Sequence, residues 1–181
     1  MAAYTAIDDP EAYFQTQLYT GDGSANHAIT LGADTDMQPD FVWIKNRDAT
    51  DSHCLFDSVR GATKLLSSDA NTAETTDTDT LDSFASDGFQ VDADVKVNTN
   101  TEAYVAWCWK ESATSGVDIV SYTGNGTDDT DISHNLSAVP KMIVVKNRDA
   151  ADAWQIYHGA NTSSPETDYM VLDTTAATAD A

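Results

Sequence analysis

The feature that most constrains this chain is a repeat within its own sequence. Residues 19–24 (YTGDGS) recur as residues 122–127 (YTGNGT), and residues 39–49 (PDFVWIKNRDA) recur as residues 140–150 (PKMIVVKNRDA). The blocks keep their order, Ile29 is matched by Ile132, and residues 55–56 are matched by residues 156–157. A correspondence this long predicts that the chain contains two copies of one supersecondary unit.

The repeated blocks carry the residue types of turns and strands. Glycine with Asn or Asp accepts a positive φ at low cost, so each YTG-x-G block predicts a strand that ends in a tight turn. Pro39 and Pro140 each precede a short run of β-branched and aromatic residues. These runs predict a central strand covered on both faces in each copy, and the Asn-Arg-Asp that follows predicts a turn. Residues 53–57 and 153–158 then read as the return strands of two hairpins.

The first copy continues through further predicted strands. They span residues 63–66, 81–84, 88–91 and 104–109. The last of these places Tyr104, Ala106 and Cys108 on one side. Val105, Trp107 and Trp109 fall on the other side. Residues 67–80 are dense in Ser, Thr, Asp and Ala without a periodic face, which predicts a long surface loop.

Short strands separated by Gly, Asn and Asp turns, with no stripe of helical period, predict an all-β fold. We expect a β-sandwich or jelly roll over residues 1–110, a linker over residues 111–116, and a second, related module over residues 117–181. The second module has no match to residues 81–109 of the first. Unpaired strands and a wet apolar face are costly, so we expect this module to continue in a longer chain or to be completed by a partner.

Composition limits the partners that this chain can take. Its 181 residues hold 41% hydrophobic residues, which is enough for a core, and carry a net charge of −21 spread along the sequence. Such a surface repels phosphate backbones and anionic lipids, so we expect neither nucleic-acid binding nor membrane insertion. Salt screens self-repulsion, so a saline habitat is a further hypothesis, and stability should then rise with salt.

No secretory signal or membrane-spanning run is present in the sequence. Residues 1–10 (MAAYTAIDDP) lack a basic start and an apolar stretch, so we expect synthesis in a cytoplasm. Cys54 and Cys108 lie in apolar strand contexts. Without a secretory route they are expected to be buried thiols that act as small hydrophobes.

Nine short blocks lie along both halves of the chain: IDDP at 7–10, YFQT at 13–16, YTG at 19–21, WIKNR at 43–47, DSVRG at 57–61, DGF at 87–89 and YVAW at 104–107, with YTGNG at 122–126 and VPKMI at 139–143 in the second half. In these blocks the chain resembles repeat-bearing proteins of marine bacteriophages, described as tail-fibre or virion structural proteins. The order Arg-Gly, acidic loop, Gly-Phe, Trp is also similar to concanavalin-type and laminin-G-like sandwiches.

The resemblance implies a place in a virion and assembly with other virion proteins, with a homotrimer as the favoured oligomer. It names no catalytic residue. Its first implication is a tail fibre or a receptor-binding adhesin that contacts a host surface glycan or protein. Two other interpretations stay open, namely a capsid decoration or head-fibre protein and a carbohydrate-active depolymerase.

Motifs of catalysis and cofactor binding are not found in the sequence, so we expect a protein that is not an enzyme and holds no cofactor. The four histidines, His27, His53, His134 and His158, form no metal-binding spacing, and no P-loop, GxGxxG or GxSxG context occurs. A glycosidase needs two carboxylates that flank a sugar bond, but no pair can be nominated among thirty acidic residues.

Calcium is the one metal that the sequence suggests. Four groups of acidic residues have loop spacing: Asp34, Asp36 and Asp40; Asp77, Asp79 and Asp82; Asp92 and Asp94; and Asp128, Asp129 and Asp131. None matches the D-x-[DN]-x-[DN]-G loop, so a solvated acidic surface is the favoured interpretation. The tryptophans could stack on sugars, but their positions inside strands favour a core role for Trp43, Trp107, Trp109 and Trp154.

Overall fold

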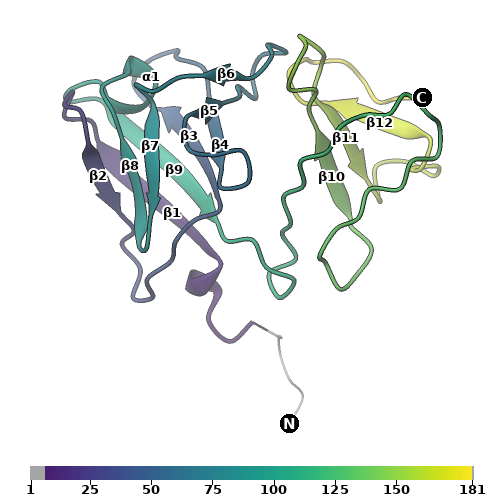
Figure 1. Cartoon of the computed structure of the whole chain (residues 1–181), viewed down its shortest axis with the longest axis horizontal. Coiled ribbons are helices and arrows are strands. Elements are labelled where there is room, and N and C mark those ends of the chain that lie inside the picture. Colours follow the sequence, from purple (N-terminus) through teal and green to yellow (C-terminus); the bar gives the residue numbers. More distant parts are fainter. Residues whose placement is uncertain (1–6, 181) are drawn as a thin grey trace.

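The computed structural model describes residues 7–180, and the predicted outer bounds at residues 1 and 181 lie outside them. The first module is a sandwich of two antiparallel sheets, as predicted (Figure 1). The larger sheet has the order β1 (Phe14–Thr20), β9 (Ala103–Trp109), β3 (Phe41–Asn46), β4 (Cys54–Asp57). The smaller sheet has the order β2 (His27–Thr30), β8 (Gly88–Val91), β7 (Leu81–Ala85).

The core of the first module lies between these two sheets. Strand β9 turns Tyr104, Ala106 and Cys108 inward, which confirms the predicted alternation. They meet residues from both sheets, including Val42, Ile44, Phe56, Leu81, Phe89 and Val91. Cys54 and Cys108 are free and buried in this core, as expected, and burial raises the pKa of each thiol to about 12.

Short elements complete the first module. A 3-10 turn, η1 (Pro10–Ala12), precedes β1, and a single helical turn, α1 (Val95–Asn98), precedes β9. The polar stretch predicted as a loop contains β6 (Thr75–Thr76), which pairs with β5 (Lys64–Leu65). Within residues 7–180 no helix has the length and hydropathy needed to cross a bilayer.

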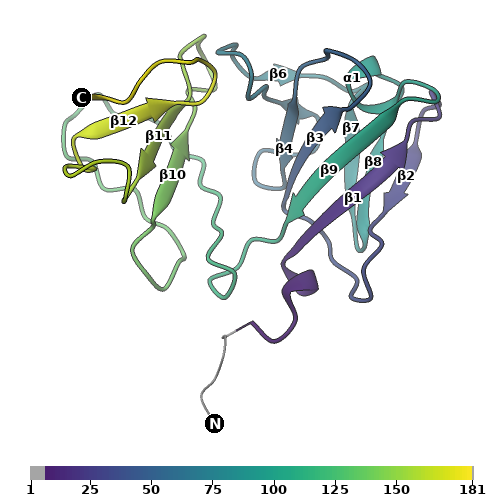
Figure 2. The same ribbon diagram turned by 180° about the vertical axis from the view of Figure 1, so that it is seen from behind.

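The second module is one antiparallel sheet beside the sandwich (Figures 1 and 2). Its order is β10 (Met142–Val145), β11 (Gln155–His158), β12 (Asp168–Val171), β13 (Ala179–Asp180). Strands β10 and β11 are the counterparts of β3 and β4 at an offset of 101 residues, because Phe41 pairs with Asp57 and Met142 with His158. Strands β12 and β13 repeat the register of β5 and β6 at an offset of 104.

The turn that joins β3 to β4 and the turn that joins β10 to β11 contain the same lysine hydrogen bonds. The Lys45 ammonium donates to the carbonyls of Asn46 and Ala49, at 2.6 and 2.9 Å. In the second copy Lys146 donates to the carbonyls of Asn147 and Ala150, at 2.7 and 3.0 Å. This bonding explains why the Lys-Asn-Arg-Asp-Ala sequence occurs twice, since it satisfies the backbone of a tight connection.

The prediction of a strand buried on both faces is wrong for both copies. Strand β3 lies inside its sheet, between β9 and β4, but alternates between buried and half-exposed residues. Strand β10 is an edge strand whose four residues are all exposed. On β3 the outward-facing residues Phe41, Trp43 and Lys45 are only half-buried. For β10 the reason is that, among the described residues, the second module contains no counterpart of β9 to lie beside it.

The same reason accounts for two strands that do not form in the second module. Strand β1 pairs with β9 and β2 pairs with β8, so each depends on residues 81–109. Their counterparts, residues 117–123 and 130–133, are irregular apart from one isolated bridge from Val117 to Ser112. A strand without a neighbour leaves its backbone groups unpaired, and extended structure is then not maintained.

Candidate functional site: an aromatic face on the larger sheet

The outer face of the larger sheet carries a group of aromatic rings, called the aromatic face below. It consists of Phe14 from β1, Phe41 and Trp43 from β3, and Trp107 and Trp109 from β9. The rings gather there because successive side chains of a strand alternate between its faces. Strand β9 directs its small residues and Tyr104 into the core, so its two tryptophans point outward.

The strand register arranges these rings in rows across the sheet. Trp109 is paired with Phe14 on one side and Phe41 on the other, with ring centroids 5.0 and 5.4 Å apart. In the next row Trp107 lies opposite Trp43, and their centroids are 6.0 Å apart at an angle of 73°. Cross-strand aromatic pairs of this geometry each contribute about 0.5–1 kcal/mol, so the rows hold the rings in fixed orientations.

The tryptophan prediction is therefore wrong for three of the four residues. Trp43, Trp107 and Trp109 are only half-buried and lie outside the main core, and the side chain of Phe14 is 42% exposed. Apolar runs in a strand do not distinguish a covered face from an aromatic one that is open to solvent. Trp154 is 5% exposed, but it belongs to a separate cluster between the modules.

The second module covers one side of the aromatic face. Trp154 packs with Leu55 and Leu66, and Phe41 and Trp43 lie against this cluster. The Trp154 indole also donates to the carbonyls of Ser67 and Ala70, at 2.9 and 3.1 Å. The face is thus closed beyond β4 and open toward β1.

An ion-pair network fixes the same contact between modules. The Arg148 guanidinium binds the Glu74 carboxylate through two bonds of 2.9 and 2.8 Å, and Arg60 donates to Glu74 at 3.0 Å. Burial alone would raise the pKa of Glu74, but the bonds from Arg148 and Arg60 outweigh it and lower that pKa. Arg60 is in turn paired with Asp57, and both side chains are less than 8% exposed.

A groove of about 420 Å³ lies next to the open side of the aromatic face. It is lined by Glu11, Phe14, Gln15, Thr16, Gln17, Gly32 and Ala33. Gln15 is held in place because its amide donates to the carbonyls of Glu11 and Thr35, at 3.0 and 2.8 Å. The exposed polar groups of the groove are Glu11 and Thr16. Aromatic rings beside carboxylate and hydroxyl groups are the combination that stacks on a sugar ring while bonding its hydroxyl groups.

His53 lies at the other side of the aromatic face. Its Nδ1 accepts a 2.8 Å hydrogen bond from the Trp43 indole, and the two rings meet edge to face at 5.8 Å. The backbone N–H of His53 is bound by the Asp69 carboxylate. Burial lowers the pKa of His53, so the neutral ring that accepts this bond is favoured.

The structure does not arrange the calcium candidates as a metal site, although Asp82 lies near enough to Asp92 and Asp79 for burial and their charges to raise its pKa. Among residues 7–180, no three His, Cys, Asp or Glu side chains form a group that could hold a metal ion. Asp77 and Asp94 flank Lys96 instead, with distances of 3.6 and 2.6 Å from its ammonium. Of the histidines, His27 bonds Asn98, and His134 and His158 accept backbone N–H bonds from the residue two positions later.

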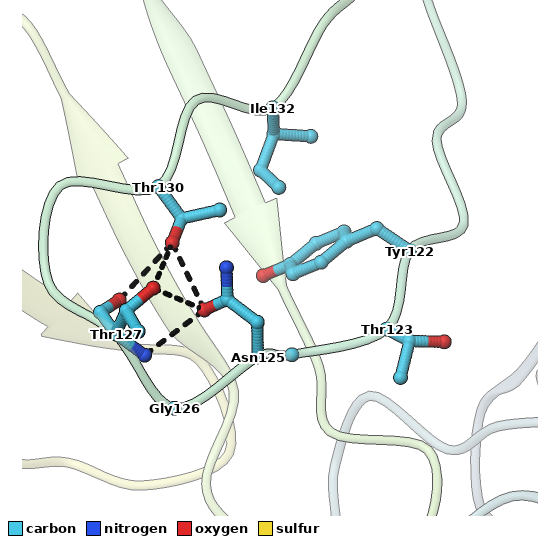
Figure 3. Close-up of a pocket in the computed structure, with 8 residues that line it drawn as sticks. Tyr122, Thr123, Asn125, Gly126, Thr127, Thr130 and Ile132 are labelled. Atoms are coloured by element: carbon cyan, nitrogen blue, oxygen red, sulfur yellow. Dashed lines mark hydrogen bonds between the residues drawn. The ribbon is translucent and has the colours of Figure 1, made fainter.

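A second concave region, called the open loop below, lies in the second module (Figure 3). It has a volume of about 280 Å³ and is lined by Tyr122, Thr123, Gly124, Asn125, Gly126, Thr127, Thr130 and Ile132. The Asn125 side-chain oxygen accepts bonds from Thr127 and Thr130, which close the loop on itself. This region is the counterpart of residues 19–29. The repeat is evident in the sequence, but the exposure of its second copy is not.

A comparison with protein families places the chain in one of them. A family model described as a domain of unknown function, DUF7483, matches residues 9–181. The chain belongs to this family. The match spans both modules of the DUF7483 chain, so the family unit includes the sandwich and the partial copy together. Neither the curated proteins nor the solved structures that were compared gave a match to it.

Proposed function

We propose that this chain is a structural and adhesive protein of a virus particle, of the tail-fibre type, and that its aromatic face contacts a glycan on the host surface. The observation that carries the proposal is the structural repeat, in which one β unit recurs with the same registers and the same turn and is clamped to its neighbour. Repeated modules give a fibre reach and many weak contacts that add to strong attachment. The phage resemblance of the sequence supports the same interpretation.

The aromatic face supports the adhesive part of the proposal. Its rings are held by their cross-strand neighbours, so little conformational freedom is lost when a flat ligand stacks on them. The adjoining groove offers the exposed Glu11 carboxylate and Thr16 hydroxyl as bonding groups next to Phe14. A neutral or weakly cationic glycan fits this site, because the net charge of −21 opposes anionic ligands.

A glycan array tests the adhesive role. The chain should bind one class of host-surface glycan, and Trp107→Ala and Trp109→Ala should each weaken binding about tenfold by removing a stacking ring. Val139→Ala is the matched control, since Val139 is 74% exposed and lies on the second module. Binding that survives both tryptophan substitutions would remove the aromatic face as the receptor site, and product release in a parallel hydrolysis assay would favour the depolymerase interpretation.

Electron microscopy of purified particles tests the location. An antibody raised against the chain should label the tail. Label on the shell would instead assign the protein to capsid decoration, and particles without label would exclude a virion protein. Mass measurement of the native oligomer in solution addresses the expected trimer.

A further inference from the structure

In the first module, the loop and the hairpin that recur in the second module pack against one segment of the chain. Residues 95–109, comprising α1 and β9, contact the loop after β1, strand β1 itself and strand β3. The second module repeats the loop and the hairpin, but the described residues provide nothing equivalent to this segment. The two modules can therefore be compared contact by contact.

The glycines of the repeated loop differ most between the copies. A Cβ atom on Gly21 would lie 2.2 Å from the carbonyl oxygen of Thr99, because the segment packs directly against that backbone. A Cβ atom on Gly124, its counterpart, would meet no atom of the described residues within 4 Å. Gly124 is not in the left-handed region, so no local conformation explains a glycine there. At Gly21 the close backbone of Thr99 requires a glycine, and at Gly124 the described residues contain no such backbone.

Apolar residues show the same difference. Tyr19 stacks on Tyr104 at 5.1 Å and donates to the carbonyl of Val97, whereas its counterpart Tyr122 is 52% exposed. Val42 and Ile44 of β3 are fully buried between the two sheets of the first module. Their counterparts Ile143 and Val145 are 44% and 37% exposed. An edge strand with four exposed apolar residues is a surface for strand addition.

A polar group adds a specific requirement. The side-chain nitrogen of Asn46 donates to Asp51, to Glu102 and to the Tyr104 hydroxyl. Its counterpart Asn147 keeps the equivalent bond, at 2.7 Å to Asp152, and is otherwise exposed. Glu102 and Tyr104 both belong to the part of the first module that has no copy, so the second module lacks these two partners.

We propose that the open side of the second module binds an extended polypeptide segment with the pattern of residues 95–109. The segment would run antiparallel to β10, as β9 does to β3, and would pass over Gly124. It would carry Glu and Tyr two positions apart, for Asn147, followed by alternating small and aromatic residues. This inference goes beyond the proposed function, because it holds whether or not the chain belongs to a virion.

The test uses the chain's own segment as a probe. A synthetic peptide of residues 95–111, carrying Cys108→Ala to prevent oxidation, is titrated into the full chain by calorimetry and followed by hydrogen exchange. Binding should occur below ~1 mM, the limit of weak specific association. Amides of β10 and of residues 122–127 should gain protection, while those of β3 should not change, because β9 already covers them.

Gly124→Ala separates this site from non-specific binding. The added methyl group has free space in the chain alone, but it would meet the peptide backbone, so affinity should fall at least ~tenfold. Ser163→Ala is the matched control, since Ser163 is exposed on the same module and away from the open loop. Peptide that binds both variants equally would overturn the proposal.

Two further outcomes also bear on it. The proposal would be overturned if ~1 mM peptide gave no heat of binding in calorimetry and no protection in hydrogen exchange. Self-association of the chain that the peptide does not displace would also overturn it, since a second copy would then fill the site. A chain extended after Ala181 by its own residues 78–111 guards against a peptide that aggregates. The extension should raise the unfolding midpoint and lower the binding of an apolar dye, and Gly124→Ala should cancel both effects.

Discussion

The same substitution at two repeated glycines should have opposite effects on stability. At Gly21 the methyl group of alanine would lie 2.2 Å from the Thr99 oxygen and 2.9 Å from the Asn98 carbonyl carbon. Both are backbone atoms, so the loop must move as a whole. Overpacking of this kind costs about 1–3 kcal/mol.

Movement of that loop also weakens three backbone hydrogen bonds. Gly21 donates to the Glu102 carbonyl and accepts from Thr101, and Gly23 donates to the carbonyl of Asn98, at 2.8–2.9 Å. A bond is worth about 1 kcal/mol net, so partial weakening of three bonds adds about 1 kcal/mol to an overpacking cost of about 2 kcal/mol. We therefore expect Gly21→Ala to lower the free energy of unfolding by about 3 kcal/mol. For a chain of this size, each kcal/mol corresponds to roughly 2–4 °C, so the midpoint should fall by about 6–12 °C.

Gly124→Ala should be neutral or slightly stabilising. Its methyl group has free space, and alanine restricts the unfolded chain, which stabilises by about 0.4–1 kcal/mol. Thermal unfolding followed by circular dichroism measures both variants against the unmodified chain. Equal shifts for the two variants, or a loss above ~1 kcal/mol for Gly124→Ala, would refute the comparison of a filled and an open loop.

Three other predictions concern the contact between modules, pH and salt. Trp154→Ala should cost about 3–5 kcal/mol and uncouple the modules, so calorimetry should resolve two transitions, and a single unshifted transition would contradict this. The pKa of His53 in the folded chain lies below its usual 6.5, so the unfolded chain takes up the proton first as the pH falls. The free energy of unfolding should therefore decrease as the pH drops from 6.5 toward the folded pKa. In denaturant titrations at several pH values, His53→Gln should remove this part of the pH dependence. Raising NaCl from ~0.1 to ~1 M should raise the unfolding midpoint by screening the net charge of −21, and a constant or falling midpoint would argue against a saline adaptation.

The sandwich can be predicted from the sequence because several local signals agree. The alternation in β9 determined which residues enter the core, and the repeated turn identified the hairpins in both modules. Strands β6 and β13 were missed because Thr75, Thr76 and Asp180 are exposed and Ala179 is only half-buried. Their contribution is made by backbone bonds, which leave no apolar period in the sequence.

The candidate site was harder to predict than the fold. Half-buried tryptophans in a strand have the same sequence pattern as core tryptophans. Only the arrangement of the sheets shows that, within residues 7–180, no other element covers the β1 side of the aromatic face. The open loop was hard to predict for a similar reason. Its sequence is nearly that of residues 19–24, which pack against residues 95–109 in the first module. The open loop is exposed because the second module has no such segment among the described residues.

The pairing of β1 with β9 has a consequence for synthesis. Phe14 lies opposite Trp109, 95 positions later, so the first strand has no neighbour until the last strand of the sandwich has left the ribosome. At about 5–20 residues per second this interval lasts on the order of 5–20 seconds. Gln15, Thr16, Gln17 and Thr20 make the waiting strand polar at most of its positions, which protects it from premature aggregation.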